Sequence, residues 1–206
     1  MAALASGSLV SEAFLLGLHS EILSEDEGQR SSGRYRDGPV RVRWKGKVVY
    51  VAPAAALIPS LMTEFLDSVE ERGSSELVIS AGRALLQLLK IHPFGQANGR
   101  TARALATYML LRGGYRERPF RTLEKYMDEN IDQYYDALAR SSVDSPEPWD
   151  AYFFRAVEEV FKSPDSGVSA EFRARIGESF RKAFRYVRTA SLYEPVNNNP
   201  RIPARA

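Results

Sequence analysis

Residues 92–103 read His-Pro-Phe-Gly-Gln-Ala-Asn-Gly-Arg-Thr-Ala-Arg and lie between two stretches with helical apolar spacing. The small residues in this segment allow the backbone to approach a bound group closely. Pro93 disfavours helical geometry at His92, so the preceding helix is predicted to end there. A new helix is predicted to begin near Asn98. The N–H groups at the start of that helix would form an anion site.

The polar side chains of this segment suit a ligand that carries phosphate. Arg100 and Arg103 are three positions apart, which places them on one face of a helix. Guanidinium groups bind phosphate oxygens bidentately and stay charged, and Asn98 adds a neutral donor. His92 is one of two histidines in the chain and is well suited to accept a proton near neutral pH. Each residue alone also fits a structural role, so the prediction depends on their combination.

The remaining sequence is mostly helical in pattern. Ser11 is a candidate N-cap for a first helix that continues to Leu23. Residues 40–51 instead alternate apolar and basic side chains around a Lys-Gly-Lys turn, which is typical of a β-hairpin. Gly113-Gly114 is expected to end the helix that follows the loop. Other helices are predicted at about 57–71, 75–90, 123–139, 149–161 and 169–189. We therefore predict a mainly α fold, a helical bundle with one hairpin.

The length of 206 residues indicates one domain, which we place at 1–195, with its core at about 11–161 and C-terminal helices at 162–190. Residues 196–206 are expected to form a flexible tail. The chain has no cysteine, so disulfides and thiolate metal sites are excluded. We find neither a convincing signal peptide nor an apolar run long enough for a membrane span. A cytoplasmic protein is expected, with delivery into another cell left open.

The net charge of +2 gives no argument for nucleic-acid binding. Basic residues nevertheless cluster in residues 30–47, in residues 112–121 and in the C-terminal segment 173–188. They fit either a solvated surface interleaved with acids or a rim that attracts polyphosphate or an acidic partner.

The loop resembles the Fic family signature, His-x-Phe-x-(Asp/Glu)-(Gly/Ala)-Asn-(Gly/Lys)-Arg, followed by a second arginine. The residues that match it are His92, Phe94, Ala97, Asn98, Gly99, Arg100 and Arg103. The hairpin lies where that family places a substrate-guiding flap, and the likeness covers roughly residues 11–161. The resemblance implies the Fic fold and a protein-AMPylating activity with ATP as donor.

The family mechanism can be carried over to the matching positions. His92 would be the general base, and Asn98 with the loop amides would hold the α-phosphate. Arg100 and Arg103 would hold the β- and γ-phosphates. The acceptor would be a Ser, Thr or Tyr hydroxyl of a protein aligned by strand addition at the flap, residues Val48, Val49, Tyr50 and Val51. The remaining loop positions of the nucleotide site are Gly95, Gln96, Ala97 and Gly99.

Gln96 occupies the position of the acid that normally holds Mg²⁺ in this family. A neutral amide oxygen is a weak ligand for a hard divalent ion. Mg²⁺ could then be held mainly by the nucleotide, another donor or geometry could be used, or the protein could bind a phosphate compound without turning it over. Transfer with another phosphate donor or to a small-molecule acceptor, and a catalytically impaired member, therefore remain as alternatives.

Two further features of the family are less defined in this sequence. Tyr134 and Tyr135 fall where members place aromatic residues near the nucleobase, although a helix-core role fits equally. Ser141 and Ser142 stand near the position of an adenine-contacting Asn, which leaves the base open. The inhibitory motif of the family has only near matches, with Glu27 and Glu194 as candidate glutamates. A small inhibitory partner could supply that function instead.

Overall fold

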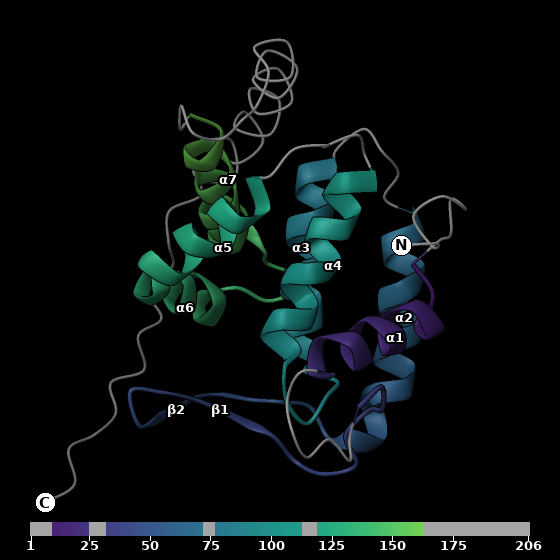
Figure 1. Ribbon diagram of the computed structural model, residues 1–206. Coiled ribbons are helices and arrows are strands. Elements are labelled where there is room, and N and C mark those ends of the chain that lie inside the picture. Colours follow the sequence, from purple (N-terminus) through teal and green to yellow (C-terminus); the bar gives the residue numbers. More distant parts are fainter. Residues whose placement is uncertain (1–9, 25–31, 72–76, 113–118, 163–206) are drawn as a thin grey trace, which may run out of the picture.

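The computed structural model describes residues 10–24, 32–71, 77–112 and 119–162. Within these ranges the chain is mainly helical with a single two-stranded antiparallel hairpin, as predicted (Figure 1). The elements, in chain order, are α1 (Glu12–Leu23), β1 (Arg41–Trp44), β2 (Lys47–Val51), a short 3-10 helix η2 (Ala55–Leu57), α2 (Ile58–Glu71), α3 (Leu77–Ile91), α4 (Asn98–Arg112), α5 (Pro119–Glu129), α6 (Ile131–Arg140) and α7 (Glu147–Lys162).

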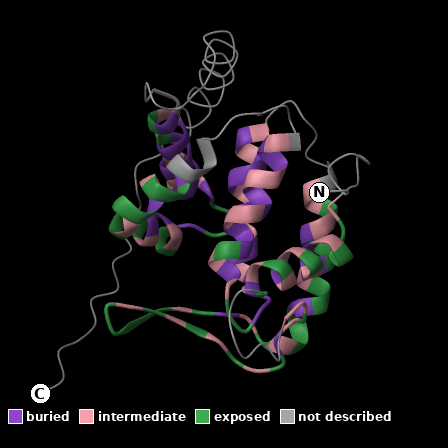
Figure 2. Cartoon of the chain, in the orientation of Figure 1, coloured by how far each residue is buried: buried purple, intermediate pink, exposed green. Residues whose placement is uncertain are grey.

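Helices α3 and α4 pack against each other at the centre of the molecule (Figure 1). Helices α1 and α2 cover one side of this pair, and α5, α6 and α7 cover the other, while the hairpin runs along one end. Ten of the fifteen residues of α3 are buried, because neighbouring helices contact most of its circumference (Figure 2). The loop that joins α3 to α4 therefore starts from a helix that is packed on most of its sides.

Helix α7 is held against α3 by a close approach at Gly82. A Cβ atom at this position would lie 2.7 Å from the ring of Phe153, so only glycine fits. The indole Nε1 of Trp149 donates to the Gly82 carbonyl at 2.7 Å. Beside it, Asp150 is buried and pairs with Arg83 at 2.8 Å. These contacts combine apolar packing with satisfied polar groups, and they hold α7 against the first half of α3.

The hairpin turns at Lys45 and Gly46, whose φ angles of 48° and 78° define a type I′ turn. Arg41 pairs with Val51 and Trp44 pairs with Lys47 across the strands. The register shifts between these pairs, because β2 has one extra residue, Val49, opposite the step from Val42 to Arg43. This β-bulge was not predicted from the alternating pattern.

The predicted helix at 123–139 is wrong as a single element, because the chain breaks at Asn130 into α5 and α6. Asn130 has φ −113° and ψ 35°, outside helical geometry. Its Nδ2 donates to the Tyr126 carbonyl at 2.9 Å, and its own carbonyl accepts from the Tyr134 N–H. An asparagine side chain that competes for backbone groups in this way ends one helix and starts the next.

The other predicted boundaries agree closely with the structure. The Ser11 hydroxyl accepts a hydrogen bond from the Phe14 N–H at 3.1 Å, so the predicted N-cap is confirmed. Gly113-Gly114, the helix expected at 169–189 and the tail 196–206 lie outside the described residues. No helix in the described part of the chain is both long and apolar enough to cross a bilayer.

Candidate active site

His92 follows the last residue of α3 in a left-handed conformation, with φ 53°. This geometry is uncommon for a residue other than glycine, and the following Pro93 excludes the helical alternative. The His92 N–H still donates to the Leu88 carbonyl at 2.9 Å, so the helix ends with a closed turn. The histidine ring is thereby turned out of the helix and half-buried at the mouth of a cavity.

The protonation state of His92 is defined by its neighbours. Nδ1 lies 3.1 Å from the Leu89 carbonyl oxygen, an acceptor, so Nδ1 carries the hydrogen and Nε2 keeps its lone pair. Burial lowers the pKa of His92 below its ordinary value, and the charge of Arg36 adds to this effect, whereas the bond to Leu89 opposes it. A neutral imidazole with Nε2 as acceptor is the form needed by a general base.

The loop is closed internally by Asn98 and Phe94. Asn98 Oδ1 accepts from the Phe94 N–H at 2.9 Å, and its Nδ2 donates to the Phe94 carbonyl at 2.8 Å. Both residues are buried, and they hold the loop in one shape at the N-terminus of α4. An amide group has two donor hydrogens, so the phosphate-binding role assigned to Asn98 stays a prediction.

His19, the second histidine, supports the loop from α1. Its ring stacks on Phe94, with centroids 3.8 Å apart and planes inclined by 5°. Nδ1 accepts from the Gly33 N–H at 3.1 Å, so the hydrogen is on Nε2, which contacts the Gln96 carbonyl at 3.3 Å. Burial lowers the pKa of His19. The neutral ring therefore joins α1, the segment before the hairpin and the loop.

Arg36 makes the corresponding connection from the base of the hairpin. Its guanidinium donates to the carbonyls of His92 at 2.8 Å, Gly38 at 2.7 Å and Pro53 at 2.7 Å. Its backbone N–H also donates to the Pro93 carbonyl at 2.9 Å. The side chain is only 8% exposed, so these carbonyls replace water as its partners.

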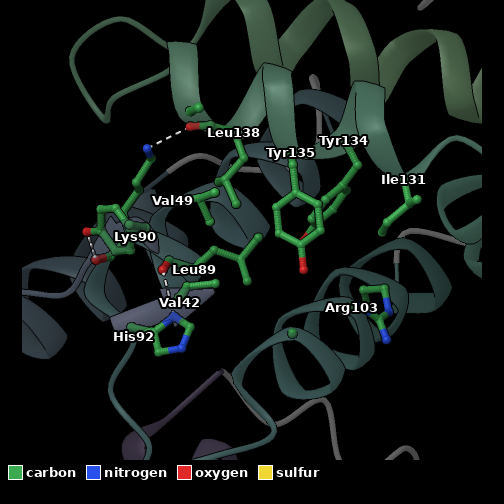
Figure 3. A pocket seen from close by; sticks show the side chains of 13 residues that line it. Val42, Val49, Leu89, Lys90, His92, Arg103, Ile131, Tyr134, Tyr135 and Leu138 are labelled. Carbon is green, nitrogen blue, oxygen red and sulfur yellow. Dashed lines mark hydrogen bonds between the residues drawn. The ribbon is translucent and has the colours of Figure 1, made fainter. Parts of the chain in front are cut away.

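A cavity of about 180 Å³ opens beside His92, between the hairpin, α6 and the ends of α3 and α4 (Figure 3). This is smaller than the roughly 300–1,000 Å³ typical of drug-sized ligand sites, so a larger ligand would extend beyond the cavity. Its wall is mainly apolar and aromatic, with basic groups at the edges. The lining residues are Val42, Val49, Tyr50, Leu89, Lys90, His92, Gly99, Arg103, Ile131, Tyr134, Tyr135, Leu138 and Ala139.

The structure separates the two arginines that the sequence places on one face. Arg103 lines the cavity, and its Nη1 lies 3.4 Å from the Cβ position of Gly99. Its Nε donates to Glu124 of α5 at 3.0 Å. Arg100 is exposed and is not among the lining residues. One turn of helix thus directs one guanidinium into the cavity and leaves the other outside it.

The tyrosine pair of α6 forms the wall opposite the loop. Tyr134 is buried and meets Tyr135 edge-to-face at 5.3 Å. The Tyr135 ring extends into the cavity, with its hydroxyl on the open side (Figure 3). Ser141, expected near a base pocket, instead accepts a hydrogen bond from the Trp149 N–H at the start of α7.

The tip of the hairpin is attached to α6. Trp44 stacks on Tyr135 with centroids 4.5 Å apart, and its Nε1 donates to Asp132 at 3.2 Å. Lys45 pairs with the same carboxylate at 2.8 Å. Because Lys45 and Asp132 are both about two-thirds exposed, 66% and 68%, this ion pair adds little stability. The hairpin tip therefore closes one side of the cavity through a ring stack and one weak ion pair.

Lys90 joins α3 to the end of α6 inside the cavity wall. Its Nζ donates to the Leu138 carbonyl at 2.7 Å and lies 5.1 Å from the centre of the Tyr50 ring. The Tyr50 hydroxyl donates in turn to the Lys90 carbonyl. Burial lowers the pKa of Lys90.

The residues around Gln96 do not form a protein metal site. The Gln96 side chain is exposed, and it places a neutral amide where the family has a carboxylate. The described residues contain no group of three or more His, Cys, Asp or Glu side chains that could hold a metal ion. A divalent ion at this loop would therefore depend on ligands from elsewhere, such as phosphates.

The structure thus brings together residues from the predicted catalytic, phosphate-binding, base-binding and flap groups: His92, Gly99, Arg103, the two tyrosines and two flap residues. Gln96, the predicted weak metal ligand, does not line the cavity. It adds three that the sequence argument missed as site residues, namely His19, Arg36 and Lys90. A histidine within the apolar spacing of the first helix was the one available signal for His19. The basic cluster in residues 30–47 included Arg36 but gave it no role in the site, and nothing in the local sequence singled out Lys90. The candidate inhibitory residues Glu27 and Glu194 lie outside the described residues.

The mainly helical fold, the loop closed by Asn98 and the neutral histidine beside a cavity are the features that this chain shares with one known class of domain. The family model described as Fic/DOC family matches residues 9–110. Residues 9–110 of this chain are therefore a Fic/DOC family domain.

Solved structures of Fic proteins have the same fold. A Fic family protein from Desulfovibrio desulfuricans G20 matches with a TM-score of 0.63 and 23% identity over 85% of this chain and 57% of its own. A Fic domain containing signaling protein from Bacteroides thetaiotaomicron VPI-5482 gives 0.55 and 22%, over 75% and 63%. Residues 134–508 of Fic-1 from C. elegans give 0.55 and 18%, over 89% and 46%. The chain therefore spans about half to two-thirds of these structures.

Proposed function

We propose that this protein is a nucleotidyltransferase that moves AMP from ATP to a Ser, Thr or Tyr hydroxyl of a target protein. The observation that carries the proposal is the state of His92. Its Nδ1 is engaged by the Leu89 carbonyl, so Nε2 is the acceptor beside the cavity. A protein that only bound phosphate would not need a neutral base held in this way.

The donor is expected to lie between α4 and the tyrosines. Amides at the N-terminus of α4 and the Arg103 guanidinium suit the phosphates, because both favour negative charge. Arg100 is proposed to reach the outer phosphate from its exposed position. Tyr134 and Tyr135 offer an apolar, aromatic wall for the base.

The chemistry proceeds by direct displacement at phosphorus. His92 Nε2 takes the proton of the acceptor hydroxyl, and the oxygen attacks the α-phosphorus of ATP. The new O–P bond forms as the bond to the β-phosphate oxygen breaks, and pyrophosphate leaves. Arg103 and the α4 amides stabilise the negative charge on the phosphates during this step. Because the residues present do not fit a protein-held Mg²⁺, no step depends on one.

The acceptor is proposed to approach along the hairpin. Val48, Val49 and Val51 of β2 are exposed, at 42%, 39% and 61%. In the described chain β2 pairs only with β1, so its other edge can receive an extended segment. Val49 and Tyr50 also line the cavity, which would bring the acceptor towards His92.

Gln96 favours a second candidate, a Fic-fold transferase with another phosphate donor or a small-molecule acceptor. The neutral amide removes a charge that would anchor a metal-bound triphosphate. A donor with fewer charges, or one bound in another orientation, would suffer less from this change. Loss of catalysis with retained binding is the limiting form of the same candidate.

Intact-mass spectrometry after incubation with ATP and Mg²⁺ tests the proposal, because a Fic enzyme without a target can modify itself. The wild-type protein is expected to gain the mass of one AMP, and His92→Ala is expected to gain none while still binding ATP by calorimetry. A gain of equal size in both proteins would overturn the role of His92. The second candidate would be favoured if the protein bound ATP without transferring AMP but did transfer a group from another phosphate donor.

A further inference from the structure

The hairpin carries a positive charge that the chemistry at His92 does not use. Residues 40–51 contain four basic side chains and no acidic one. Lys45 is paired with Asp132, but Arg41, Arg43 and Lys47 are exposed and form no ion pair within the described residues. An unpaired cluster of one sign on a projecting element attracts an oppositely charged partner.

The pairing of the strands fixes the direction of these side chains. Val42 and Tyr50 are paired and both line the cavity. Side chains alternate along a strand, so Arg41 and Arg43 project from the opposite face. Their cross-strand partners are Val51 and Val48, which are exposed. We call this set, Arg41, Arg43, Val48 and Val51, the outer hairpin face.

The outer hairpin face suits a polypeptide rather than a nucleic acid or a lipid surface. The unpaired edge of β2 offers N–H and C=O groups in a spacing that only another peptide backbone matches. The two valines offer apolar contact to alternate side chains of such a strand. A strand added beside β2 would lie about 10 Å from β1. An arginine extending from β1 and a glutamate extending from the added strand can together bridge that distance.

We propose that the acceptor segment recognised by this protein is an extended, acidic stretch of the target, with Asp or Glu side chains next to the modified hydroxyl. The inference rests on the proposed function for its catalytic meaning, but the binding surface can be tested separately. Charge on such a rim acts mainly on the rate of encounter and on salt dependence. Arg41 and Arg43 would be specificity residues, and neither contributes to the core.

The test uses three peptides with the same Thr-Tyr-Val centre and flanks of Glu, Gln or Lys, each labelled with a fluorophore. Binding is measured by anisotropy at several salt concentrations, and AMP transfer to the same peptides is measured by mass spectrometry. Wild type is expected to prefer the Glu-flanked peptide about five- to tenfold over the Gln-flanked one, as two exposed ion pairs allow. The preference should fall as salt rises.

The variants separate the effect of charge on the outer hairpin face from the effect of the protein's net charge. Arg41→Ala/Arg43→Ala should lose the preference, and Arg41→Lys/Arg43→Lys should keep it. Arg155→Glu, at an exposed position on α7, lowers the net charge as much as the double alanine variant and should keep the preference. Thermal unfolding checks that all four proteins are folded, and ATP binding should be unchanged in each.

Two results would overturn the proposal: equal binding of all three peptides, or a preference that survives the double alanine variant. Tighter binding of a single-stranded oligonucleotide, lost in that variant, would assign the face to nucleic acid instead. Failure of the proposed function has a different signature. Binding of the acidic peptide would then depend on Arg41 and Arg43 while no peptide received AMP.

Discussion

Arg36 donates from Nε to the carbonyl oxygen of His92 at 2.8 Å, which ties the base of the hairpin to the residue with the proposed catalytic ring. The two residues are 56 positions apart in the chain. The same guanidinium binds the carbonyls before and after the hairpin, at Gly38 and Pro53. We therefore expect movement of the hairpin base and the conformation of His92 to be coupled through this one side chain.

Replacing Arg36 with Met should lower both stability and transfer. Three carbonyls would lose a charged donor, which is expected to cost about 2–4 kcal/mol in the free energy of unfolding. His92 would lose its support, so turnover should fall more than ATP affinity. Urea unfolding and transfer kinetics check this, with Arg155→Met as the control for loss of an exposed arginine. Unfolding at the wild-type midpoint would contradict the proposed coupling.

The rate of transfer should depend on pH through His92. Burial lowers the pKa of its ring from the ordinary value of 6.5, so the neutral base persists at lower pH than an exposed histidine would. The acid limb of the kcat/KM profile is therefore expected at a midpoint below 6.5. A midpoint above that value would show that a carboxylate neighbour or the bound substrate dominates, and not burial.

The stability of the folded protein should also decrease as the pH is lowered, because of His19. Its pKa in the folded state is lowered from 6.5, so the unfolded chain binds the proton first as the pH falls. Stability from the neutral ring is complete above 6.5 and declines below it. His19→Phe keeps the stack on Phe94 but cannot titrate. The stability gap between wild type and this variant should narrow in acid, and a gap that stays constant with pH would refute the assignment.

Replacing Gln96 with Glu should strengthen the use of Mg²⁺. A carboxylate restores the charged oxygen ligand that the amide lacks, so the Mg²⁺ concentration for half-maximal transfer should fall about tenfold or more. The rate at saturating Mg²⁺ should rise under the proposed function. A Mg²⁺ titration of both proteins measures this. If neither the midpoint nor the rate changes, this position does not contact the ion.

Glu124 is expected to compete with a bound nucleotide for Arg103. Their 3.0 Å contact is partly exposed, with side chains 26% and 51% accessible, so its net strength is modest. Glu124→Gln should free the guanidinium and tighten ATP about two- to fivefold, measured by calorimetry. Glu129→Gln, which removes the same charge from an exposed i,i+4 pair on α5, is the matched control. If both variants tightened ATP binding equally, the effect would come from the change in overall charge and not from the release of Arg103.

The sequence alone determined the local parts of this protein. The spacing of apolar residues predicted most helices, Ser11 marked the first N-cap, and the alternation around Gly46 marked the hairpin. The order of residues in the loop, His92 to Arg103, identified the family. These features are local, because propensity, capping and turn geometry act over a few neighbouring residues.

Only the tertiary structure decided which side chains meet. Arg36 and His19 reach the loop from distant segments, and no periodicity encodes such contacts. Arg100 and Arg103 share a helix face, yet only Arg103 lines the cavity, because α5, α6 and the hairpin enclose one part of that face. The break at Asn130, which turns α6 and Tyr135 towards the hairpin, depends on packing that a helical pattern across residues 123–139 does not reveal.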